Sequence, residues 1–581
     1  MDKLYQPDRT PPMTANPDDD GRGVLAAEAY LTTLSRGGVD ALYAVAGTDF
    51  PSIVEAYAAA LAGGVALPKP YTVAHENLAV SMAHGDALRT GRPQAAMVHV
   101  SVGTANMICG AMNASRDGVP LVLSAGRTPL TEDGPEGTRS RYIHWAQEMF
   151  DQGGMIREAV KWDYELRAAE QVEDVTRRAL DIAAAPPPGP VYLSLPRELL
   201  ARRVPKAGPP RQRSRVSAPA PDPAAIDRLA AAIRAADYPL IVTSNAGREP
   251  RALAILTELC EAWALPVAQF NARSVSLPFD HEMAVGFDTR NAFGAADLVL
   301  SIACDVPYVP SVTRPRPQGA LWEIDHDPLF SRYPLRSFPA VESIVAGPAA
   351  GLAALAEALG APSRDDAPRI ARRRAAVARE RQKRASAAAL DMSRLTAETA
   401  SVVIADRIPS EAALVNEYSF RTDYAHFDRP GQFYGISPAG GLGLGFGAAL
   451  GIAAAETREG SNRPVVVTLG DGAYMFNNPV ACHWASAAHG LPVLAIIFNN
   501  RRWGAVRNST LAMYPQGAAA AGNGMMLADL SPSPDYAAIC RAHGGEGITV
   551  ADIADLPAAI DRGLDAIGSG RQALLDLVLV D

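Results

Sequence analysis

The sequence predicts an α/β protein with three domains, each a parallel sheet flanked by helices. Short apolar runs of the kind that form buried strands recur along the chain, and segments of helix length separate them. This alternation is typical of βαβ units, whose strands lie parallel. The chain has 581 residues, too many for one hydrophobic core, and the alternating pattern restarts twice.

The first domain is predicted over residues 23–200. It contains the helix-like runs VLAAEAYLTTLSRGG and HENLAVSMAHGDALRTG and the strand-like runs ALYAVAG, QAAMVHVS, PLVLSAG and PVYLSLP. Before it, residues 1–22 are polar and carry prolines, so we expect a flexible arm. After it, residues 201–223 are rich in proline and basic side chains, so we expect a linker.

Two further domains follow the linker. Residues 224–360 contain the strand-like runs PLIVTSNAG, LPVAQF and ADLVLSIACD, and residues 395–581 contain PVVVTLG and LPVLAIIFNN. Between them, residues 361–394 carry the charged helical run RIARRRAAVARERQKRA. A charge run of this kind is usually a solvated face, so we expect a connector helix rather than a surface for nucleic acid.

The composition argues against several classes of protein. The formal net charge is −9, so no overall attraction to nucleic acid or to an anionic membrane is expected. The sequence has neither a run of about 18 uncharged apolar residues nor an apolar signal core near its start, so we expect no membrane span and no secretion signal. The five cysteines form no CxxC pair, which favours a reducing compartment. A cytoplasmic enzyme is therefore predicted.

The strongest chemical signal lies in the third domain, where polar residues follow two strand-like runs. Gly470, Asp471 and Gly472 follow the first run, and Asn499 and Asn500 follow the second, with a helix-length segment between them. A right-handed crossover would bring both carboxyl ends to one sheet edge, where ligands of open α/β sheets bind. Asp471 and Asn500 would then supply oxygen ligands for Mg²⁺ or Ca²⁺, with a diphosphate completing the coordination and the glycines admitting its phosphates. Either residue alone is also common in turns, so the inference depends on the pair.

This arrangement resembles the family of thiamine diphosphate (ThDP) enzymes that includes acetolactate synthase, benzoylformate decarboxylase and 2-hydroxyacyl-CoA lyase. The family motif is GDG, a spacer and NN, and here Asp471 and Asn500 are 29 positions apart (500 − 471). Two more segments match in the expected order: the stretch from His75 through SVGTAN, and GGLGLGFGAALG at 440–451. The resemblance covers most of the chain. It implies a pyrimidine-binding domain at 23–200, a middle domain at 224–360, and a diphosphate- and metal-binding domain at 395–581.

The resemblance also implies roles for individual residues. Glu76 matches the glutamate that hydrogen-bonds the aminopyrimidine ring and so helps to remove the proton from the reactive thiazolium carbon. Leu442 matches the apolar residue that supports the bent cofactor, although the glycine run around it could equally serve helix packing. The metal ligands would be Asp471, Asn500 and the backbone carbonyl of Arg502. The implied cofactor-binding residues are Glu76, Thr104, Asn106, Leu442, Gly470, Gly472, Ala473 and Tyr474. Family members build each site from two chains, so we expect a homodimer or homotetramer.

Three side chains are candidates for contact with the substrate. His99 aligns with an active-site histidine of benzoylformate decarboxylase, which acetolactate synthases usually lack. It would move protons or bind a substrate oxygen, and the alternative is a structural histidine at a strand end. Tyr142 and His144 fall in a segment that approaches the substrate in relatives, and they are expected to be catalytic as well.

These features leave the substrate open. We predict a ThDP- and Mg²⁺-dependent lyase or carboligase and favour a 2-hydroxyacyl-CoA lyase, which cleaves its substrate reversibly to a carbonyl compound and formyl-CoA. The basis is the polar and aromatic run at 142–148 and three arginines that could meet an acyl-CoA phosphate, Arg501, Arg502 and Arg507. The alternative is an acetolactate synthase or a 2-oxo acid decarboxylase of the benzoylformate type. A noncatalytic module is disfavoured because Glu76 and Asp471 are present.

The middle domain resembles one that binds FAD in acetolactate synthases and ADP or coenzyme A in CoA enzymes. It carries no clear nucleotide motif, so we expect it either to bind such a group or to be empty.

Overall fold

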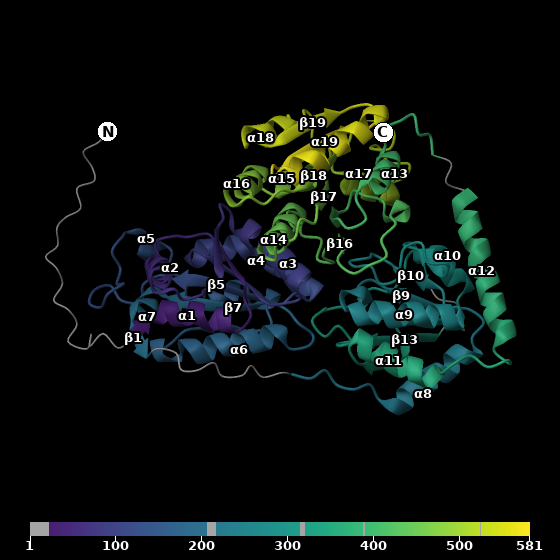
Figure 1. Ribbon diagram of the computed structural model, residues 1–581, viewed down its shortest axis with the longest axis horizontal. Coiled ribbons are helices and arrows are strands. Elements are labelled where there is room, and N and C mark those ends of the chain that lie inside the picture. Colours follow the sequence, from purple (N-terminus) through teal and green to yellow (C-terminus); the bar gives the residue numbers. More distant parts are fainter. Residues whose placement is uncertain (1–22, 206–215, 314–319, 387–389, 523, 581) are drawn as a thin grey trace.

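The computed structural model describes residues 23–205, 216–313, 320–386, 390–522 and 524–580. They form three six-stranded parallel sheets flanked by helices (Figure 1). The N-terminal and middle domains lie side by side in this view, and the C-terminal domain packs above them. The predicted α/β fold with three parallel-sheet domains is confirmed. The predicted arm at 1–22 lies outside the described residues.

The N-terminal domain contains the sheet β3–β2–β4–β5–β7–β6. Its strands are β2 (Ala41–Ala44), β3 (Lys69–Thr72), β4 (Gln94–Val98), β5 (Leu121–Arg127), β6 (Asp163–Glu165) and β7 (Val191–Pro196). Its helices are α1 (Ala26–Arg36), α2 (Pro51–Gly63), α3 (Glu76–Thr90), α4 (Val100–Asp117), α5 (Ile143–Ala146), α6 (Val172–Ala184) and α7 (Arg197–Ala201). The short strand β1 (Gly23–Leu25) pairs antiparallel with β8 (Arg203–Pro205), so the first residues of the predicted linker pack on this domain.

The middle domain contains the sheet β11–β10–β9–β12–β13–β14. Its strands are β9 (Pro239–Thr243), β10 (Val267–Ala268), β11 (Ala284–Gly286), β12 (Leu298–Ile302), β13 (Ala320–Asp325) and β14 (Ala340–Val345). Its helices are α8 (Pro223–Ala235), α9 (Pro250–Trp263), α10 (Thr289–Ala295) and α11 (Pro348–Leu359).

The C-terminal domain contains the sheet β16–β15–β17–β18–β20–β19. Its strands are β15 (Ala413–Glu417), β16 (Phe433–Gly435), β17 (Val465–Gly470), β18 (Leu494–Asn499), β19 (Glu546–Val550) and β20 (Ala573–Val578). Its helices are α13 (Ala397–Arg407), α14 (Gly445–Arg458), α15 (Asp471–Phe476), α16 (Pro479–His489), α17 (Gly504–Met513), α18 (Tyr536–Ala542) and α19 (Leu556–Gly568).

The strand orders show that the first and last domains share one layout. When the strands of each sheet are numbered along the chain, both domains have the order 2-1-3-4-6-5, whereas the middle sheet has the order 3-2-1-4-5-6. Each order reverses direction beside its first strand, and ligands of open parallel sheets bind at the carboxyl ends of the strands at such a reversal. The reversals fall between β2 and β4, between β9 and β12, and between β15 and β17.

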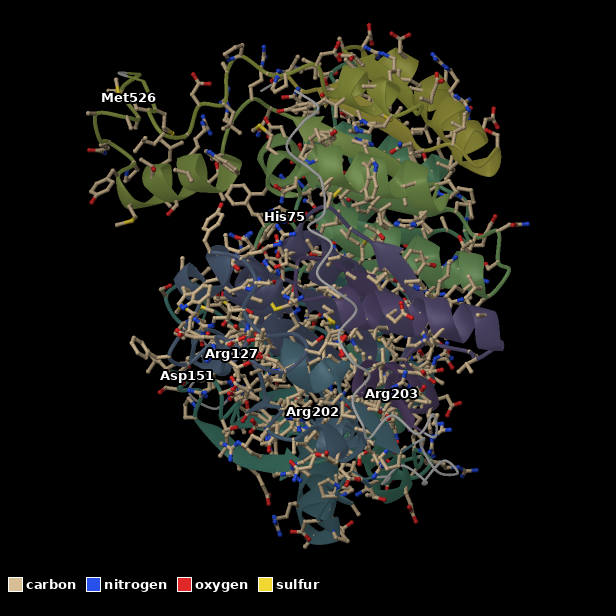
Figure 2. The ribbon with its side chains drawn as sticks, turned by 90° about the vertical axis from the view of Figure 1, so that its left-hand side faces the viewer. His75, Arg127, Asp151, Arg202, Arg203 and Met526 are labelled. Carbon is tan, nitrogen blue, oxygen red and sulfur yellow. The ribbon has the colours of Figure 1, made fainter. Side chains whose placement is uncertain are left out.

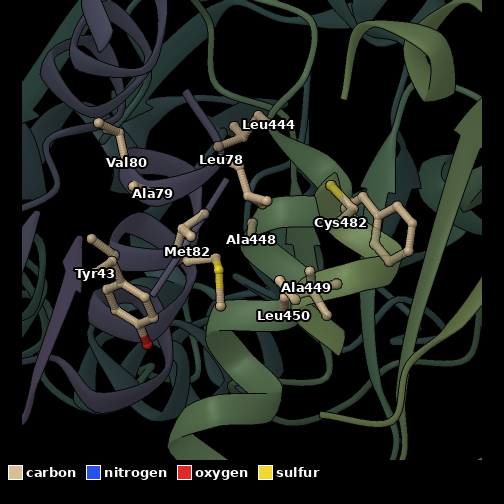
Figure 3. Packing of buried hydrophobic residues seen from close by; sticks show 14 of the residues in the cluster. Tyr43, Leu78, Ala79, Val80, Met82, Leu444, Ala448, Ala449, Leu450 and Cys482 are labelled. Carbon is tan, nitrogen blue, oxygen red and sulfur yellow. The ribbon is translucent and has the colours of Figure 1, made fainter. Parts of the chain in front are cut away.

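Helices α3 and α14 join the N-terminal and C-terminal domains through a close apolar contact. Figure 3 shows Leu78 and Met82 of α3 facing Ala448 of α14 within a cluster of buried residues. Glycines make the close approach possible, because a Cβ atom on Gly85 would lie 1.9 Å from the carbonyl oxygen of Ala448. A Cβ atom on Gly451 would lie 1.9 Å from the carbonyl oxygen of Met82. Part of the glycine run at 440–451 therefore serves helix packing.

The connector predicted at 361–394 contains α12 (Ala367–Ser386), which lies along the edge of the middle domain (Figure 1). The expectation of a merely solvated helix is wrong for one face, because Arg373 and Val377 are each 1% exposed. The Arg373 guanidinium donates to the carbonyls of Ile233, Ala236 and Trp263, which lie at the ends of α8 and α9. Carbonyls at a helix end have no partner within the helix, and this buried side chain satisfies them. Burial lowers the pKa of Arg373 to about 10.

Candidate active site

Asp471 lies at the carboxyl end of β17, beside the strand-order reversal of the C-terminal sheet. Asp471 is 2% exposed, and its Oδ1 accepts a hydrogen bond of 2.9 Å from the Gly472 N–H. Its Oδ2 is buried without a hydrogen-bond partner among the described residues. Burial raises the pKa of Asp471, and the backbone amides of Gly472, Arg501 and Arg502 act in the opposite direction. A buried carboxylate oxygen without a partner is costly, and a divalent cation would satisfy it.

The two asparagines after β18 have different surroundings. Strands β17 and β18 pair with Gly470 opposite Phe498, which brings both strand ends to one edge, as predicted. Asn499 is 2% exposed and donates to Asp576 Oδ1 over 3.0 Å, so it is a structural residue. Asn500 is half-buried, and its Oδ1 accepts a hydrogen bond of 3.2 Å from the Arg502 N–H. The backbone amides of Arg501 and Arg502 act on the Asp471 carboxyl group, so this turn lies beside Asp471.

The residues after Asp471 are packed against the same turn. A Cβ atom on Gly472 would lie 2.2 Å from the Trp503 ring, so this position requires glycine. Ala473 is 7% exposed, and Tyr474 is fully buried with its hydroxyl 2.8 Å from His483 Nε2. The Tyr474 side chain therefore points into the core, and only its backbone could contact a cofactor. No cluster of three His, Cys, Asp or Glu side chains suited to a metal occurs among the described residues, so a metal here would rely on amide and carbonyl oxygens besides the Asp471 carboxylate.

The loop that carries Leu442 is fixed by a residue that the sequence did not single out. Glu417 ends β15, is 1% exposed, and accepts hydrogen bonds from the backbone amides of Gly443 and Gly445 over 3.0 and 2.9 Å. Asn477 donates to the same carboxyl group over 2.9 Å. Burial raises the pKa of Glu417, and these three groups together with the Leu444 amide oppose the rise. Leu442 itself is half-buried and packs against the shared core of the two domains.

Glu76 is the first residue of α3. The helix begins there because His75 accepts a hydrogen bond from the Asn77 N–H through its ring Nδ1, over 3.2 Å. His75 lies near the boundary of the N-terminal and C-terminal domains (Figure 2). Asn106 on α4 donates to Glu76 Oε2 over 3.0 Å, so these two predicted residues lie together. Both remain accessible, Glu76 half-buried and Asn106 exposed.

Thr104 lies on the same helix as Asn106 but faces the interior. It is 0% exposed, and its hydroxyl lies 2.8 Å from the carbonyl of Val100 and 2.7 Å from the hydroxyl of Tyr192. No part of this side chain is open to a ligand. The sequence motif that contains Asn106 also contains Thr104, but the helical period turns Thr104 toward the sheet.

His99 follows β4 at the strand-order reversal of the N-terminal sheet. Its Nδ1 lies 2.5 Å from Asp49 Oδ1, and its side chain is 17% exposed while that of Asp49 is 3% exposed. Its Nε2 lies 3.4 Å from Gln147 Nε2. Asp49 follows β2, the neighbouring strand, so the topology brings the two residues together from 50 positions apart. Sequence reasoning selected the histidine and missed the carboxylate.

The segment at 142–148 contributes one buried and one exposed candidate. His144 is 2% exposed, accepts from the Ser140 N–H at Nδ1 over 3.2 Å, and lies 3.5 Å from Thr48 Oγ1 at Nε2. Burial, followed by nearby arginines, lowers its pKa, so the ring is neutral. Tyr142 is 87% exposed. Glu148 pairs with Arg127 and Arg139 over 2.7 Å, which makes it structural.

A separate cavity of about 300 Å³ lies between the N-terminal and middle domains, at the reversal between β9 and β12. Its lining includes five basic side chains: Arg116, Lys161, Arg248, Arg273 and Arg332. Arg273 is 7% exposed, and its Nε has no hydrogen-bond partner among the described residues. Burial lowers the pKa of Lys161 to about 8. Some of this charge is already paired, since Arg248 donates to Asp117 Oδ1 over 2.7 Å.

Comparison with known families identifies the type of protein that carries these sites. The family model described as "Thiamine pyrophosphate enzyme, N-terminal TPP binding domain" matches residues 25–155, and its C-terminal counterpart matches residues 418–577. The first match includes Glu76 and His99, and the second includes Asp471 and Asn500. The chain belongs to the thiamine diphosphate-dependent enzymes. Within them it is a catalytic enzyme of the acetolactate synthase and benzoylformate decarboxylase type.

Several relatives of this ThDP enzyme are similar over nearly their whole length. It is 29% identical to benzoylformate decarboxylase of Pseudomonas aeruginosa, over 87% of this chain and 90% of the relative. It is 24% identical to the acetolactate synthase isozyme 3 large subunit of Escherichia coli, over 87% of each chain. A probable 2-ketoarginine decarboxylase of Pseudomonas aeruginosa is 26% identical, over 90% of this chain and 88% of the relative.

Solved structures share the fold of this ThDP enzyme. The 4-hydroxybenzoylformate decarboxylase of Rhodococcus jostii RHA1 superposes with a TM-score of 0.77 at 21% identity, over 96% of this chain and 100% of that chain. This likeness shows the fold alone. Among the residues that the structure describes, no helix combines the length and apolar character needed to cross a membrane.

Proposed function

We propose that this enzyme is a 2-oxo acid decarboxylase of the benzoylformate type that uses ThDP and Mg²⁺. The observation that carries the proposal is the His99–Asp49 pair at the strand-order reversal of the N-terminal sheet. An imidazole that is anchored by a buried carboxylate and still partly exposed is suited to giving and taking a proton at a bound substrate. Two of the similar relatives are decarboxylases by name, which supports the same reaction class.

The cofactor would be held at the carboxyl edge of the C-terminal sheet. Asp471, Asn500 and the backbone carbonyl of Arg502 would bind Mg²⁺, and the unpartnered Oδ2 of Asp471 supports this assignment. The backbone amides around Gly472 would face the diphosphate. The close Trp503 ring leaves room at this position only for glycine. When bound, ThDP supplies a carbon nucleophile that adds to a carbonyl group and a ring that stores the released electron pair.

Side chains of the chain would orient the cofactor and move the protons. Glu76 would share a proton with the aminopyrimidine ring, and the Asn106 amide would hold its carboxyl group in place. Leu442 would support the cofactor, on a loop that Glu417 fixes through three backbone amides. His99 would give or take a proton at the substrate, and neutral His144 would donate to an oxygen from its Nε2.

A second copy of the chain would complete the site. Helix α4 presents the exposed side chains of Val102 and Met112 on the face that carries Asn106. On the C-terminal domain, the apolar residues Phe476, Val480, Trp484, Met513, Met526 and Leu527 are exposed, and Met526 lies at the end of a projecting segment (Figure 2). Apolar surfaces of this kind mark protein interfaces. A homodimer would cover both faces, and a homotetramer is the larger possibility.

A 2-hydroxyacyl-CoA lyase is the second candidate, and one observation favours it. The cavity between the N-terminal and middle domains is lined by five basic side chains, among them the buried Arg273. Such a cavity could take the diphosphate of coenzyme A, ADP or FAD. The arginines after Asn500 support this candidate less directly, since Arg501 is exposed and the Arg502 Nε donates to the carbonyl of Asn500.

The two candidates separate in one experiment. Purified protein is reconstituted with ThDP and MgCl₂ and incubated in parallel with benzoylformate, pyruvate and a 2-hydroxyacyl-CoA. The decarboxylase predicts CO₂ and aldehyde in equal amounts from a 2-oxo acid, and loss of both products in a Glu76→Gln variant. If the thioester gives formyl-CoA and no 2-oxo acid gives CO₂, the enzyme is a 2-hydroxyacyl-CoA lyase instead. Acetolactate formed from pyruvate would indicate an acetolactate synthase.

A further inference from the structure

The carboxylate of Asp49 is held between two donors at the end of β2. Its Oδ1 lies 2.5 Å from His99 Nδ1, and its Oδ2 accepts a hydrogen bond of 3.3 Å from the Val100 N–H. We propose that Asp49 is a positioning residue that fixes the tautomer and orientation of His99, so that the ring nitrogen Nε2 carries the lone pair toward the substrate. This proposal rests on the proton-transfer role proposed for His99.

Two glycines make room for the Asp49–His99 pair. A Cβ atom on Gly47 would lie 2.2 Å from His99 Cγ and Nδ1, and a Cβ atom on Gly126 would lie 1.8 Å from Asp49 Oδ2. Neither position could carry a larger residue without displacing the pair. Val100 has a φ of 32°, which is unusual for a β-branched residue, and its N–H is the one that Asp49 accepts. A strained residue persists where its surroundings fix it, and such residues gather at functional sites.

The hydrogen bonds around the imidazole assign its tautomer. Asp49 Oδ1 lies 2.5 Å from His99 Nδ1, and a carboxylate oxygen only accepts, so His99 Nδ1 is the donor. The proton must then lie on Nδ1, where it donates to Asp49. The other groups near the ring do not compete for it, because neutral His144 faces Thr48 and Glu148 is paired with Arg127 and Arg139. The carboxylate of Asp49 is therefore the group that keeps the proton on Nδ1.

A carboxylate performs this task and a carboxamide of the same shape does not. The two donors at Asp49 need two acceptor oxygens, and Asn has only one. If the oxygen of an Asp49→Asn variant stays on the Val100 N–H, its NH₂ group faces His99 Nδ1 and makes this nitrogen the acceptor. The ring proton then moves to Nε2, which is the wrong tautomer for a base. An equivalent exchange in a serine protease triad keeps the geometry and lowers kcat about 10⁴-fold.

The test combines a spectroscopic signature with kinetics on the full-length protein. ¹⁵N-histidine labelling and proton–nitrogen correlation spectra distinguish the two tautomers, and a His99→Ala variant assigns the signals of one ring among the ten histidines. In the wild type, His99 is expected to carry its proton on Nδ1. In Asp49→Asn the proton should lie on Nε2, and kcat should fall about 10²- to 10⁴-fold with ThDP affinity unchanged.

The outcomes separate the two proposals. A wild-type His99 protonated on Nε2 in its neutral form overturns the role of Asp49 without any variant, so the test does not depend on Asp49→Asn folding. If Asp49→Asn leaves the tautomer and kcat unchanged while His99→Ala is inactive, only the role of Asp49 fails. If His99→Ala keeps full kcat, the proton-transfer role of His99 fails instead, whatever the tautomer. With both roles correct, adding Asp49→Asn to His99→Ala should lower kcat no further.

Discussion

Replacing Asp471 by asparagine should change stability in opposite directions with and without cofactor. In the cofactor-free protein, Asp471 is a buried carboxyl group whose Oδ2 has no hydrogen-bond partner among the described residues, and burial raises its pKa. An Asn side chain keeps the acceptor for the Gly472 N–H and removes the buried charge. Burying an unpaired charge is costly and the variant avoids that cost, so the melting temperature of cofactor-free Asp471→Asn should equal or exceed that of the wild type.

The effect reverses when ThDP and Mg²⁺ are present. A ligand at 100 times its Kd stabilises the protein it binds by about 2.7 kcal/mol. For a domain of this size that corresponds to a rise of roughly 5–10 °C in Tm. The wild type should show this rise, and Asp471→Asn should show almost none because the carboxylate that binds the ion is lost. Since protons compete with Mg²⁺ for a carboxylate whose pKa is raised by burial, the wild-type rise should also shrink as the pH falls.

The assay is differential scanning fluorimetry with and without ThDP and MgCl₂, paired with calorimetric titration of ThDP. Asp565→Asn, a change of the same chemistry at an exposed position of α19, is the matched control and should retain the full rise. An equal rise in Asp471→Asn and in the wild type would refute the assignment of Asp471 as the ligand of the ion. A lower Tm of the cofactor-free variant would refute the claim that its carboxylate is unpaired and costly.

Three further predictions concern other parts of the molecule. His99→Ala should lower kcat by about 10²- to 10⁴-fold with unchanged ThDP affinity, as steady-state assays and titration on one preparation would show, whereas a purely structural histidine would instead lower Tm and yield. Gly85→Ala places a Cβ atom 1.9 Å from the Ala448 carbonyl oxygen and should lower the free energy of unfolding by about 1–3 kcal/mol in urea titrations. The control Gly294→Ala, where nothing described lies within 4 Å, should not lower it. Equal stabilities of the two variants would contradict the close helix packing. Burial lowers the pKa of His483 to about 4, so on acidification the unfolded chain takes up the proton before the folded one. The free energy of unfolding should therefore fall by about 2 kcal/mol from pH 7 to pH 5. The variant His483→Gln should lack this part of the pH dependence, and a profile equal to that of the wild type would contradict the prediction.

The fold could be predicted because its signals are local. Buried parallel strands are continuous apolar runs, and the helices between them have the length of a crossover, so both elements are visible within short windows. Asp471 and Asn500 could be predicted for a related reason: each directly follows a strand, and the crossover rule brings neighbouring strand ends together. The strand order 2-1-3-4-6-5 could not be predicted, since nothing in one strand specifies its neighbour in the sheet.

The parts of the site that the sequence missed depend on long-range pairing. Asp49 follows a strand and Glu417 ends one, but their partners lie in other elements, 50 residues away for His99 and 28 for Gly445. The sequence motifs also do not show which of their residues are exposed and which are buried. Asn106 is exposed beside Glu76, whereas Thr104 and Tyr474, taken from the same motifs, are buried in the core. The burial of Arg373 could not be predicted, because in a charged run the sequence pattern of one buried arginine is the same as that of the solvated arginines around it.

Glu76 and the sheet edge at Asp471 are proposed to act on one bound cofactor. The most direct measurement is the rate of deuterium exchange at the C2 carbon of enzyme-bound ThDP in D₂O, followed by rapid quench and NMR. Glu76→Gln should bind ThDP with nearly wild-type affinity and exchange this proton far more slowly, while Glu55→Gln, at an exposed position on α2, should match the wild type. An exchange rate in Glu76→Gln equal to that of the wild type, with ThDP fully bound, would contradict the account.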